Sequence, residues 1–204
     1  MRPEREIING FVLHRDALDR AAQEAMVQDC RAVIRAAPLV QPVTPWGKPM
    51  SVRMTSAGRV GWVIDRGQYS YADRHPRTGT PWPPIPASIL AVWRAFTDWP
   101  ADPDCCLINW YGEGARMGLH QDKDEGDFAP PVLSISLGDP ARFRMGGKTR
   151  KGPTCSTILN SGDVVVMGGE ARLAHHGIDR VLFGEGDLLP DSGRINLTLR
   201  VVTD

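Results

Sequence analysis

The second half of the chain is a succession of short apolar runs, and this pattern constrains the fold more than any other feature. From about residue 104 onward, runs such as "DCCLINWY", "VLSISLG", "DVVVMGG" and "RINLTLRVV" are separated by turns rich in Gly, Pro and Asp. Many short strands at this spacing are typical of a β-sandwich or jelly roll. We therefore expect a mainly β core in this half.

Helical periodicity occurs only in the first half of the chain. Apolar residues recur at helical spacing from Asp16, which can cap a helix, to about Ala37, and Pro38 follows. A second helix is predicted to start near Pro86. The intervening residues 39–85 are rich in Pro, Gly, Trp and Tyr, and this segment is too short to build an independent core.

Length and charge limit the classes of function. The chain has 204 residues, of which 42% are hydrophobic, so we expect one domain, with or without a lid. Lys+Arg and Asp+Glu both number 24, so any attraction to nucleic acid must come from local patches. No apolar run is long enough to cross a membrane, and no secretory signal is visible. The four cysteines form no CxxC pair, which favours reduced thiols in the cytoplasm.

Alternation along two of the predicted strands places polar side chains on one face. Asn109 and Tyr111 of "CLINWYG" point the same way. In "RINLTLRV" four polar residues share one face, namely Arg194, Asn196, Thr198 and Arg200. Taken alone, this second strand could equally be half-exposed, with its polar face in water.

The residues also support the hypothesis of a metal site. His120 and Asp122 are two positions apart, so both can reach one point from an extended segment. "RLAHHGI" adds His175 and His176, of which only one can face inward. Two imidazoles and one carboxylate suit non-haem Fe(II) or catalytic zinc. An inward arginine such as Arg194 could bind the distal carboxylate of 2-oxoglutarate, which favours iron. The alternative is a salt-bridged surface loop plus a core histidine.

Four stretches taken together resemble the bacterial AlkB-type dioxygenases, the alkylation-repair branch of the Fe(II)/2-oxoglutarate oxygenases. They are "INWYGEGARMGLHQDKDE", "PVLSISLG", "GDVVVMGGEARLAHHGI" and "RINLTLR", and the resemblance covers about residues 40–202. It implies an α+β, mainly β fold with a double-stranded β-helix (jelly roll) core and flanking N-terminal helices. The single domain 1–204 would have residues 41–82 as a nucleotide-recognition lid and residues 104–202 as the catalytic core.

The resemblance also implies roles for individual residues. His120, Asp122 and His176 would be the iron ligands, with His175 outside the first shell. The residues that would hold 2-oxoglutarate are Asn109, Tyr111, Arg194, Asn196 and Arg200. Arg194 would pair with the distal carboxylate, and Arg200 would lie near the metal-bound end and count among the catalytic residues.

Three further residues are candidates for contact with the substrate. Trp62 matches the family's base-stacking tryptophan, and Tyr69 matches a lid tyrosine near the substrate phosphate. N1-methyladenine and N3-methylcytosine are cations at neutral pH, so the carboxylate of Asp124 and the face of Trp62 would both attract them. The alternatives are ordinary core packing for Trp62 and a solvated acid in an acidic turn for Asp124.

The implied activity is oxidative demethylation of such bases, using O₂ and 2-oxoglutarate and releasing formaldehyde, succinate and CO₂. The partner would be alkylated single- or double-stranded DNA, or RNA, with no membrane and no obligate protein partner, and the protein would be a monomer. A related oxygenase acting on RNA, protein or a small molecule is the alternative, and a non-catalytic nucleic-acid binder is a third.

A basic run without acids remains open to two interpretations. "ARFRMGGKTRKG" carries Arg142, Arg144, Lys148, Arg150 and Lys151. It could be a hairpin that contacts phosphates. It could equally be the soluble rim of a surface hairpin.

Overall fold

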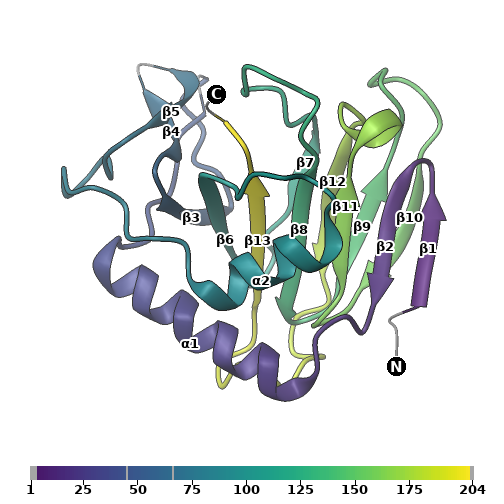
Figure 1. The fold of residues 1–204 in the computed structure, drawn as a ribbon, viewed down its shortest axis with the longest axis horizontal. Coiled ribbons are helices and arrows are strands. Elements are labelled where there is room, and N and C mark those ends of the chain that lie inside the picture. Colours follow the sequence, from purple (N-terminus) through teal and green to yellow (C-terminus); the bar gives the residue numbers. More distant parts are fainter. Residues whose placement is uncertain (1–3, 45, 66, 203–204) are drawn as a thin grey trace.

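Two antiparallel sheets packed face to face form the body of the protein (Figure 1). A computed structural model describes residues 4–44, 46–65 and 67–202. The larger sheet has the order β1 (Glu4–Ile8), β2 (Phe11–Arg15), β11 (Val164–Met167), β8 (Val132–Gly138), β13 (Arg194–Arg200), β6 (Cys105–Tyr111), β3 (Val52–Gly58). The smaller sheet has the order β10 (Cys155–Leu159), β9 (Ala141–Met145), β12 (His176–Val181), β7 (Met117–His120). This mainly β jelly roll with few helices confirms the predicted fold class.

The apolar core between the sheets explains why they stay together. Leu107 and Val165 from the larger sheet pack in one cluster with Phe143 and Ile178 from the smaller sheet. A single 3₁₀ turn, η1 (Gly169–Ala171), precedes β12 and also buries Ala171 in this cluster. Such interdigitation of two inner faces is the usual source of stability in β-sandwiches.

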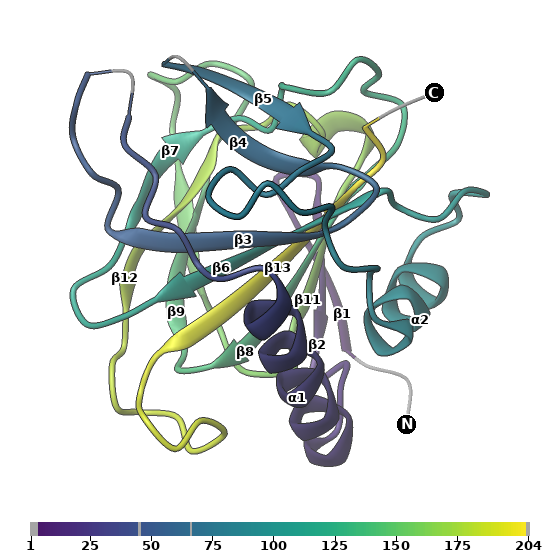
Figure 2. The same cartoon turned by 90° about the vertical axis from the view of Figure 1, so that its left-hand side faces the viewer.

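Both helices cover the opposite face of the larger sheet (Figures 1 and 2). The helices α1 (Arg20–Ala36) and α2 (Ala87–Phe96) occupy the two segments predicted to be helical. The predicted cap is wrong, because α1 is capped by Asp19, whose Oδ1 accepts the Ala22 backbone N–H at 2.8 Å. Asp16 instead adopts a positive φ of 47° before the helix begins.

Strand β13 lies between the helices on one side and the smaller sheet on the other, so both of its faces are covered. Its apolar residues pack under the helices with the cluster that includes Trp93. Its polar face is turned toward the smaller sheet, where Arg194, Thr198 and Arg200 are all buried. The alternative of a half-exposed strand with a polar face in water is therefore wrong.

The hairpin of β4 (Gly61–Asp65) and β5 (Gln68–Ala72) stands apart from both sheets (Figure 2). It lies within the predicted lid, residues 41–82. Strand β3 lies in the same range but pairs with β6 along its whole length, so that part of the segment belongs to the larger sheet. The N-terminal strands β1 and β2 extend the same sheet and were not predicted from the sequence.

Neither described helix combines the length and the apolar character needed to cross a membrane.

Replacing Leu197 by alanine tests the central position of β13. Leu197 is 0% exposed and lies between Ile108 and Ile135 in the sheet. We expect Leu197→Ala to lower the free energy of unfolding by about 2–5 kcal/mol, because it leaves a cavity. The control Ile7→Ala, at a side chain that is 64% exposed, should change it by no more than about 0.5 kcal/mol. Urea denaturation measures both, and equal losses would contradict this account of the core.

Candidate active site

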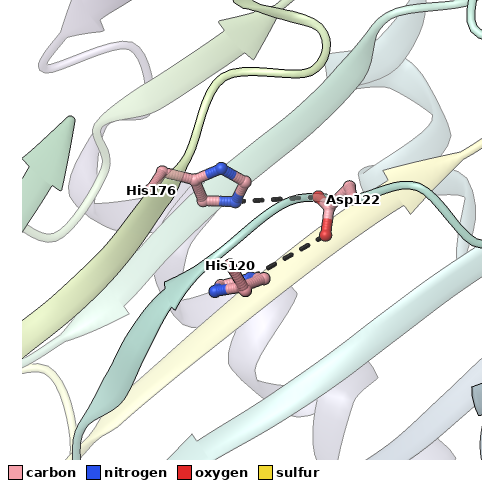
Figure 3. Close-up of side chains that lie close together, drawn as sticks. All are labelled: His120, Asp122 and His176. Atoms are coloured by element: carbon pink, nitrogen blue, oxygen red, sulfur yellow. Dashed lines mark ion pairs between the residues drawn. The ribbon is translucent and has the colours of Figure 1, made fainter. Parts of the chain in front are cut away.

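Two neighbouring strands bring the predicted metal ligands together (Figure 3). His120 ends β7, His176 begins β12, and the two residues are direct partners in the antiparallel ladder. Asp122 follows β7 after one residue. Its carboxylate oxygens lie 3.8 Å from His120 Nε2 and 3.7 Å from His176 Nε2. One ligand atom from each residue lies within 4.8 Å of the other two, which is close enough for a single metal ion.

The backbone fixes the tautomer of both histidines. His120 Nδ1 lies 2.9 Å from the carbonyl of Gly118, and His176 Nδ1 lies 3.1 Å from the carbonyl of Ala174. A carbonyl only accepts, so each Nδ1 carries the proton and donates it. The lone pair of each imidazole is therefore on Nε2, the nitrogen that faces Asp122, as metal coordination requires.

Burial and charge prepare His176 and Asp122 for a cation. Burial, together with the nearby His120, lowers the pKa of His176 to about 4, so this imidazole is neutral at pH 7. Burial alone would raise the pKa of Asp122, but the Arg200 guanidinium and then the two imidazoles hold it well below its usual range. A neutral imidazole and an ionised carboxylate are the forms that bind metals, so little proton release is needed.

His175 is turned away from this cluster. Its Nδ1 and its backbone N–H both lie within hydrogen-bond distance of the Gly147 carbonyl, at 3.1 and 2.9 Å. The neighbouring His176 instead directs Nε2 toward Asp122. Strand alternation in "HHG" thus separates the two side chains, as the sequence predicts.

A pocket of about 460 Å³ contains the cluster and extends to Arg194. Every residue that the sequence analysis placed in the site lines this pocket, from Asn109 on β6 to Trp62 on β4. Arg194 is 0% exposed, and its Nη2 donates to Ser136 Oγ at 2.7 Å. Burial lowers the pKa of Arg194 to about 10, which still leaves it charged at neutral pH. No ion pair to Arg194 is found among the described residues, so a buried cation faces the pocket without an anion.

Unpaired polar atoms mark where a ligand fits. Five buried polar atoms without a hydrogen-bond partner belong to residues of this pocket: Asn109 Oδ1, Asp122 Oδ2, Arg194 Nε, Arg200 Nε and Arg200 Nη1. Buried polar groups are almost always satisfied in native proteins. An Fe(II) ion beside Asp122 Oδ2 and an acid ligand beside Arg194 Nε would supply partners for those two atoms, so the residues fit both groups.

A buried ionic network holds Asp122 in place. Arg200 Nη2 donates to Asp122 Oδ1 at 2.8 Å, and Arg200 Nε lies 3.2 Å from Glu125 Oε1. Arg172 binds the other oxygen of Glu125 at 3.1 Å and the backbone carbonyl of Asp122 at 2.6 Å. Tyr71 on β5 donates to Glu125 Oε1 at 2.5 Å. The metal-binding loop is therefore tied both to β13 and to the β4–β5 hairpin.

Sequence reasoning missed Glu125, Arg172 and Tyr71. Sequence analysis singled out only Asp124 in this acidic turn, whereas its neighbour Glu125 is only 6% exposed. The available signal was Arg172, which stands between Ala171 and Leu173 in a segment that is otherwise short of charge. A buried arginine needs an acid nearby, but the sequence does not tell which acid is its partner.

The hairpin contributes an aromatic wall with an acid at its edge. The rings of Trp62 and Tyr69 are stacked, with centroids 5.2 Å apart and planes inclined by 23°. Trp62 Nε1 donates to Asp124 Oδ2 at 2.9 Å. Trp62 and Asp124 both line the pocket, so the exposed Asp124 carboxylate is oriented by the hairpin.

Comparison with known proteins agrees with this geometry. The family model described as the 2OG-Fe(II) oxygenase superfamily matches residues 10–200. The chain is 53% identical to the alpha-ketoglutarate-dependent dioxygenase AlkB homolog of Caulobacter vibrioides (strain NA1000 / CB15N), over 95% of this chain and 88% of the relative. It is 43% identical to the alpha-ketoglutarate-dependent dioxygenase AlkB of Escherichia coli (strain K12), over 93% of this chain and 88% of that one.

A solved structure shows the same architecture. The structure of OsALKBH1 superposes with a TM-score of 0.83 and 29% sequence identity, covering 97% of this chain and 100% of the other. The similarity therefore spans both sheets and both described helices. With its metal-binding cluster and its buried, unpaired arginine, the chain belongs to the 2OG-Fe(II) oxygenase superfamily.

Proposed function

We propose that this Fe(II)/2-oxoglutarate-dependent dioxygenase demethylates N1-methyladenine and N3-methylcytosine in nucleic acid, as a direct reversal of alkylation damage. The observation that carries the proposal is the composition of one pocket. The metal-ligand cluster and Arg194 lie in the same cavity as an aromatic wall and an oriented acid, Asp124. The first pair of features serves the oxygenase chemistry, and the second pair suits a flat, cationic base.

The oxygenase half of the pocket has a role for each residue. His120, Asp122 and His176 hold Fe(II), and Arg194 binds the distal carboxylate of 2-oxoglutarate, with Asn109, Tyr111 and Asn196 around it. When bound, Fe(II) and 2-oxoglutarate would supply O₂ activation, with succinate and CO₂ as the products of the cosubstrate and one oxygen atom delivered to the substrate. Arg200 keeps Asp122 ionised and fixed, and its unpaired Nη1 is available to the metal-bound end of the cosubstrate.

The substrate half orients the methyl group. Trp62 stacks on the base, and Asp124 stabilises its positive ring. Tyr69 lies beside Trp62, near the phosphate of the substrate nucleotide. Methylation on the pairing edge weakens pairing, which lowers the free energy needed to flip the base into the pocket. Oxidation of the methyl group gives an N-hydroxymethyl base, which breaks its N–C bond to release formaldehyde and a proton. The neutral base that remains has lost its attraction to Asp124, and this favours release.

Mass spectrometry of methylated oligonucleotides tests the proposal. Matched DNA and RNA strands, single and double, each carrying one N1-methyladenine or N3-methylcytosine, are incubated with Fe(II), 2-oxoglutarate and O₂. A loss of 14 mass units with equimolar succinate is the expected result, because one CH₂ is removed as formaldehyde. The His176→Ala variant serves as the control. Succinate formation without any change in the oligonucleotides would direct the search to a protein or small-molecule substrate.

We further propose that the enzyme acts as a monomer in the cytoplasm on alkylated DNA or RNA. The four cysteines are all free, which accords with a reducing compartment. A single chain supplies every residue to which a role is assigned above.

Iron binding should distinguish the adjacent histidines. We expect His176→Ala to lower the affinity for Fe(II) at least tenfold, because one of three ligands is lost. His175→Ala, whose side chain is turned toward Gly147, should change it less than twofold. Anaerobic titration with Fe(II), or with Co(II) as a spectroscopic substitute, measures both. The reverse order would show that the strand register is wrong.

Arg194→Ala should weaken the binding of 2-oxoglutarate much more than the binding of nucleic acid. A charge-assisted contact in a buried site is removed, so a loss of about 2–5 kcal/mol in cosubstrate affinity is expected. Calorimetry with the Co(II)-loaded protein gives this Kd, and fluorescence anisotropy gives the Kd for an oligonucleotide. An unchanged cosubstrate Kd would remove Arg194 from the binding site.

Asp124→Asn should discriminate substrates by charge. Asparagine retains an oxygen that can accept from Trp62, so the change removes the charge and leaves the geometry. We expect kcat/KM to fall about fivefold more for N1-methyladenine than for the neutral N1-methylguanine, since a hydrated charge pair contributes about 1 kcal/mol.

The comparison requires one preparation of the Asp124→Asn variant with its iron content measured. Iron loss through the neighbouring Asp122 would depress both substrates alike. Equal losses with intact iron content would assign Asp124 to loop structure only.

A further inference from the structure

An arginine-lined groove on the smaller sheet has no role in the site described above. It has a volume of about 760 Å³ and contains five arginines: Arg116, Arg142, Arg144, Arg150 and Arg180. We call it the arginine groove. It shares four lining residues with the catalytic pocket, namely Met117, Leu119, Arg150 and Ile178. The two cavities are therefore neighbours on either side of β7, the edge strand of the smaller sheet.

The fold assembles these arginines from separate elements. Arg142 and Arg144 alternate with the buried Phe143 on β9, so both point to the outer face of the sheet. Arg180 reaches the same face because β12 shifts register between Ile178 and Arg180. Strict alternation would place Arg180 on the inner side with Ile178. The extra residue, Asp179, re-aims it, as β-bulges near functional sites often do.

The groove concentrates positive charge in a protein whose net charge is zero. Asp179 is the one acid that lines it, and both its contacts go to Arg144, at 3.0 and 2.9 Å. Within the described part of the chain, the other four arginines of the groove have no ion pair. Arg142 and Arg180 are also direct partners across the β9–β12 ladder. Like charges in such a pair destabilise a sheet, so an anion between them would relieve a cost that the free protein bears.

We propose that the arginine groove binds the sugar–phosphate backbone of the nucleic-acid strand on one side of the nucleotide held in the catalytic pocket. Guanidinium groups bind phosphates in a bidentate manner, and several in a row suit a polyanion better than a single small anion. Arg150 lines both cavities and marks where the strand passes from one to the other. This inference rests on nucleic acid being the substrate, as proposed above.

The groove also separates the members of the basic run at residues 142–151. Arg142, Arg144 and Arg150 line it, whereas Lys148 and Lys151 do not. The run therefore contains both phosphate-binding residues and residues of a surface rim, the two interpretations that the sequence left open. Its arginines belong to the binding surface, and its two lysines belong to the exposed rim of the hairpin.

The salt dependence of binding tests the proposal without requiring turnover. Fluorescence anisotropy with an unmodified single-stranded 15-mer gives Kd over a range of NaCl concentrations. Arg142→Gln/Arg180→Gln removes two phosphate contacts, so the slope of log K against log salt should become shallower by about 1.4, at about 0.7 per contact. The control Arg31→Gln/Arg35→Gln removes the same charge from α1, on the other face of the larger sheet, and should leave the slope unchanged. Arg142→Lys/Arg180→Lys should retain most of the slope.

Three outcomes would overturn the groove as a strand-binding surface. One is a wild-type slope in Arg142→Gln/Arg180→Gln with unaltered thermal unfolding. Another is a slope that becomes equally shallow in the α1 control, which would attribute the effect to net charge alone. The third is inorganic phosphate, at matched ionic strength, abolishing the difference between wild type and variant, which would assign the groove to a small anion.

A catalytic readout separates the groove from the proposed function. The ratio of kcat/KM on a methylated 15-mer to that on a methylated trinucleotide should fall at least fivefold in Arg142→Gln/Arg180→Gln, because only the longer strand reaches the groove. Absence of demethylation in the wild type would refute the proposed substrate and leave the binding result standing. Demethylation with an unchanged ratio and an unchanged slope would refute the groove alone.

Discussion

The buried ion pair between Asp122 and Arg200 organises the catalytic end of the molecule. Two charges removed from water are stable only when geometry and additional hydrogen bonds compensate for desolvation. Here Glu125 and Arg172 provide that compensation, and Tyr71 joins the network from the β4–β5 hairpin. The same pair keeps one carboxylate ionised before any metal arrives. A two-stranded hairpin is marginal by itself, so its attachment to this network matters for the shape of the pocket.

The two buried arginines of β13 have different surroundings although they share a strand face. Arg200 has acid partners inside the protein and therefore supports structure around the metal ligand. Arg194 is equally buried but forms no ion pair with the described residues, and we propose that the cosubstrate carboxylate is its partner. Whether a buried arginine pairs with an acid of the protein or stays free for a ligand depends on its neighbours in three dimensions. The sequence pattern around Arg194 and Arg200 does not distinguish the two cases.

Features that depend on neighbouring residues in the sequence could be predicted, whereas features that depend on long-range contacts could not. Turn-bounded apolar runs predicted the β core, and alternation within β13 correctly grouped Arg194, Asn196 and Arg200. Spacing in "HQD" and "HHG" indicated the metal cluster, because the two histidines occupy strand ends and Asp122 follows one of them in extended chain. The helix cap was misplaced since Asp16 and Asp19 are equally good candidates locally. The Glu125–Arg172 pair depends on long-range packing, and the orientation of Arg180 depends on a β-bulge. Neither produces a periodic pattern in the sequence.

The pairing of His120 with His176 in the β7–β12 ladder has an evolutionary consequence. Backbone hydrogen bonds between the strands set the spacing of the two imidazoles, so the connecting chain between them has no part in setting it. Segments that join such strands can lengthen, shorten or exchange sequence without moving the metal ligands. The oxygenase chemistry can therefore be inherited unchanged while the surrounding surface diversifies toward new targets. In this chain, the arginines of β9 and the bulge in β12 lie outside the His120–His176 pair and line the arginine groove.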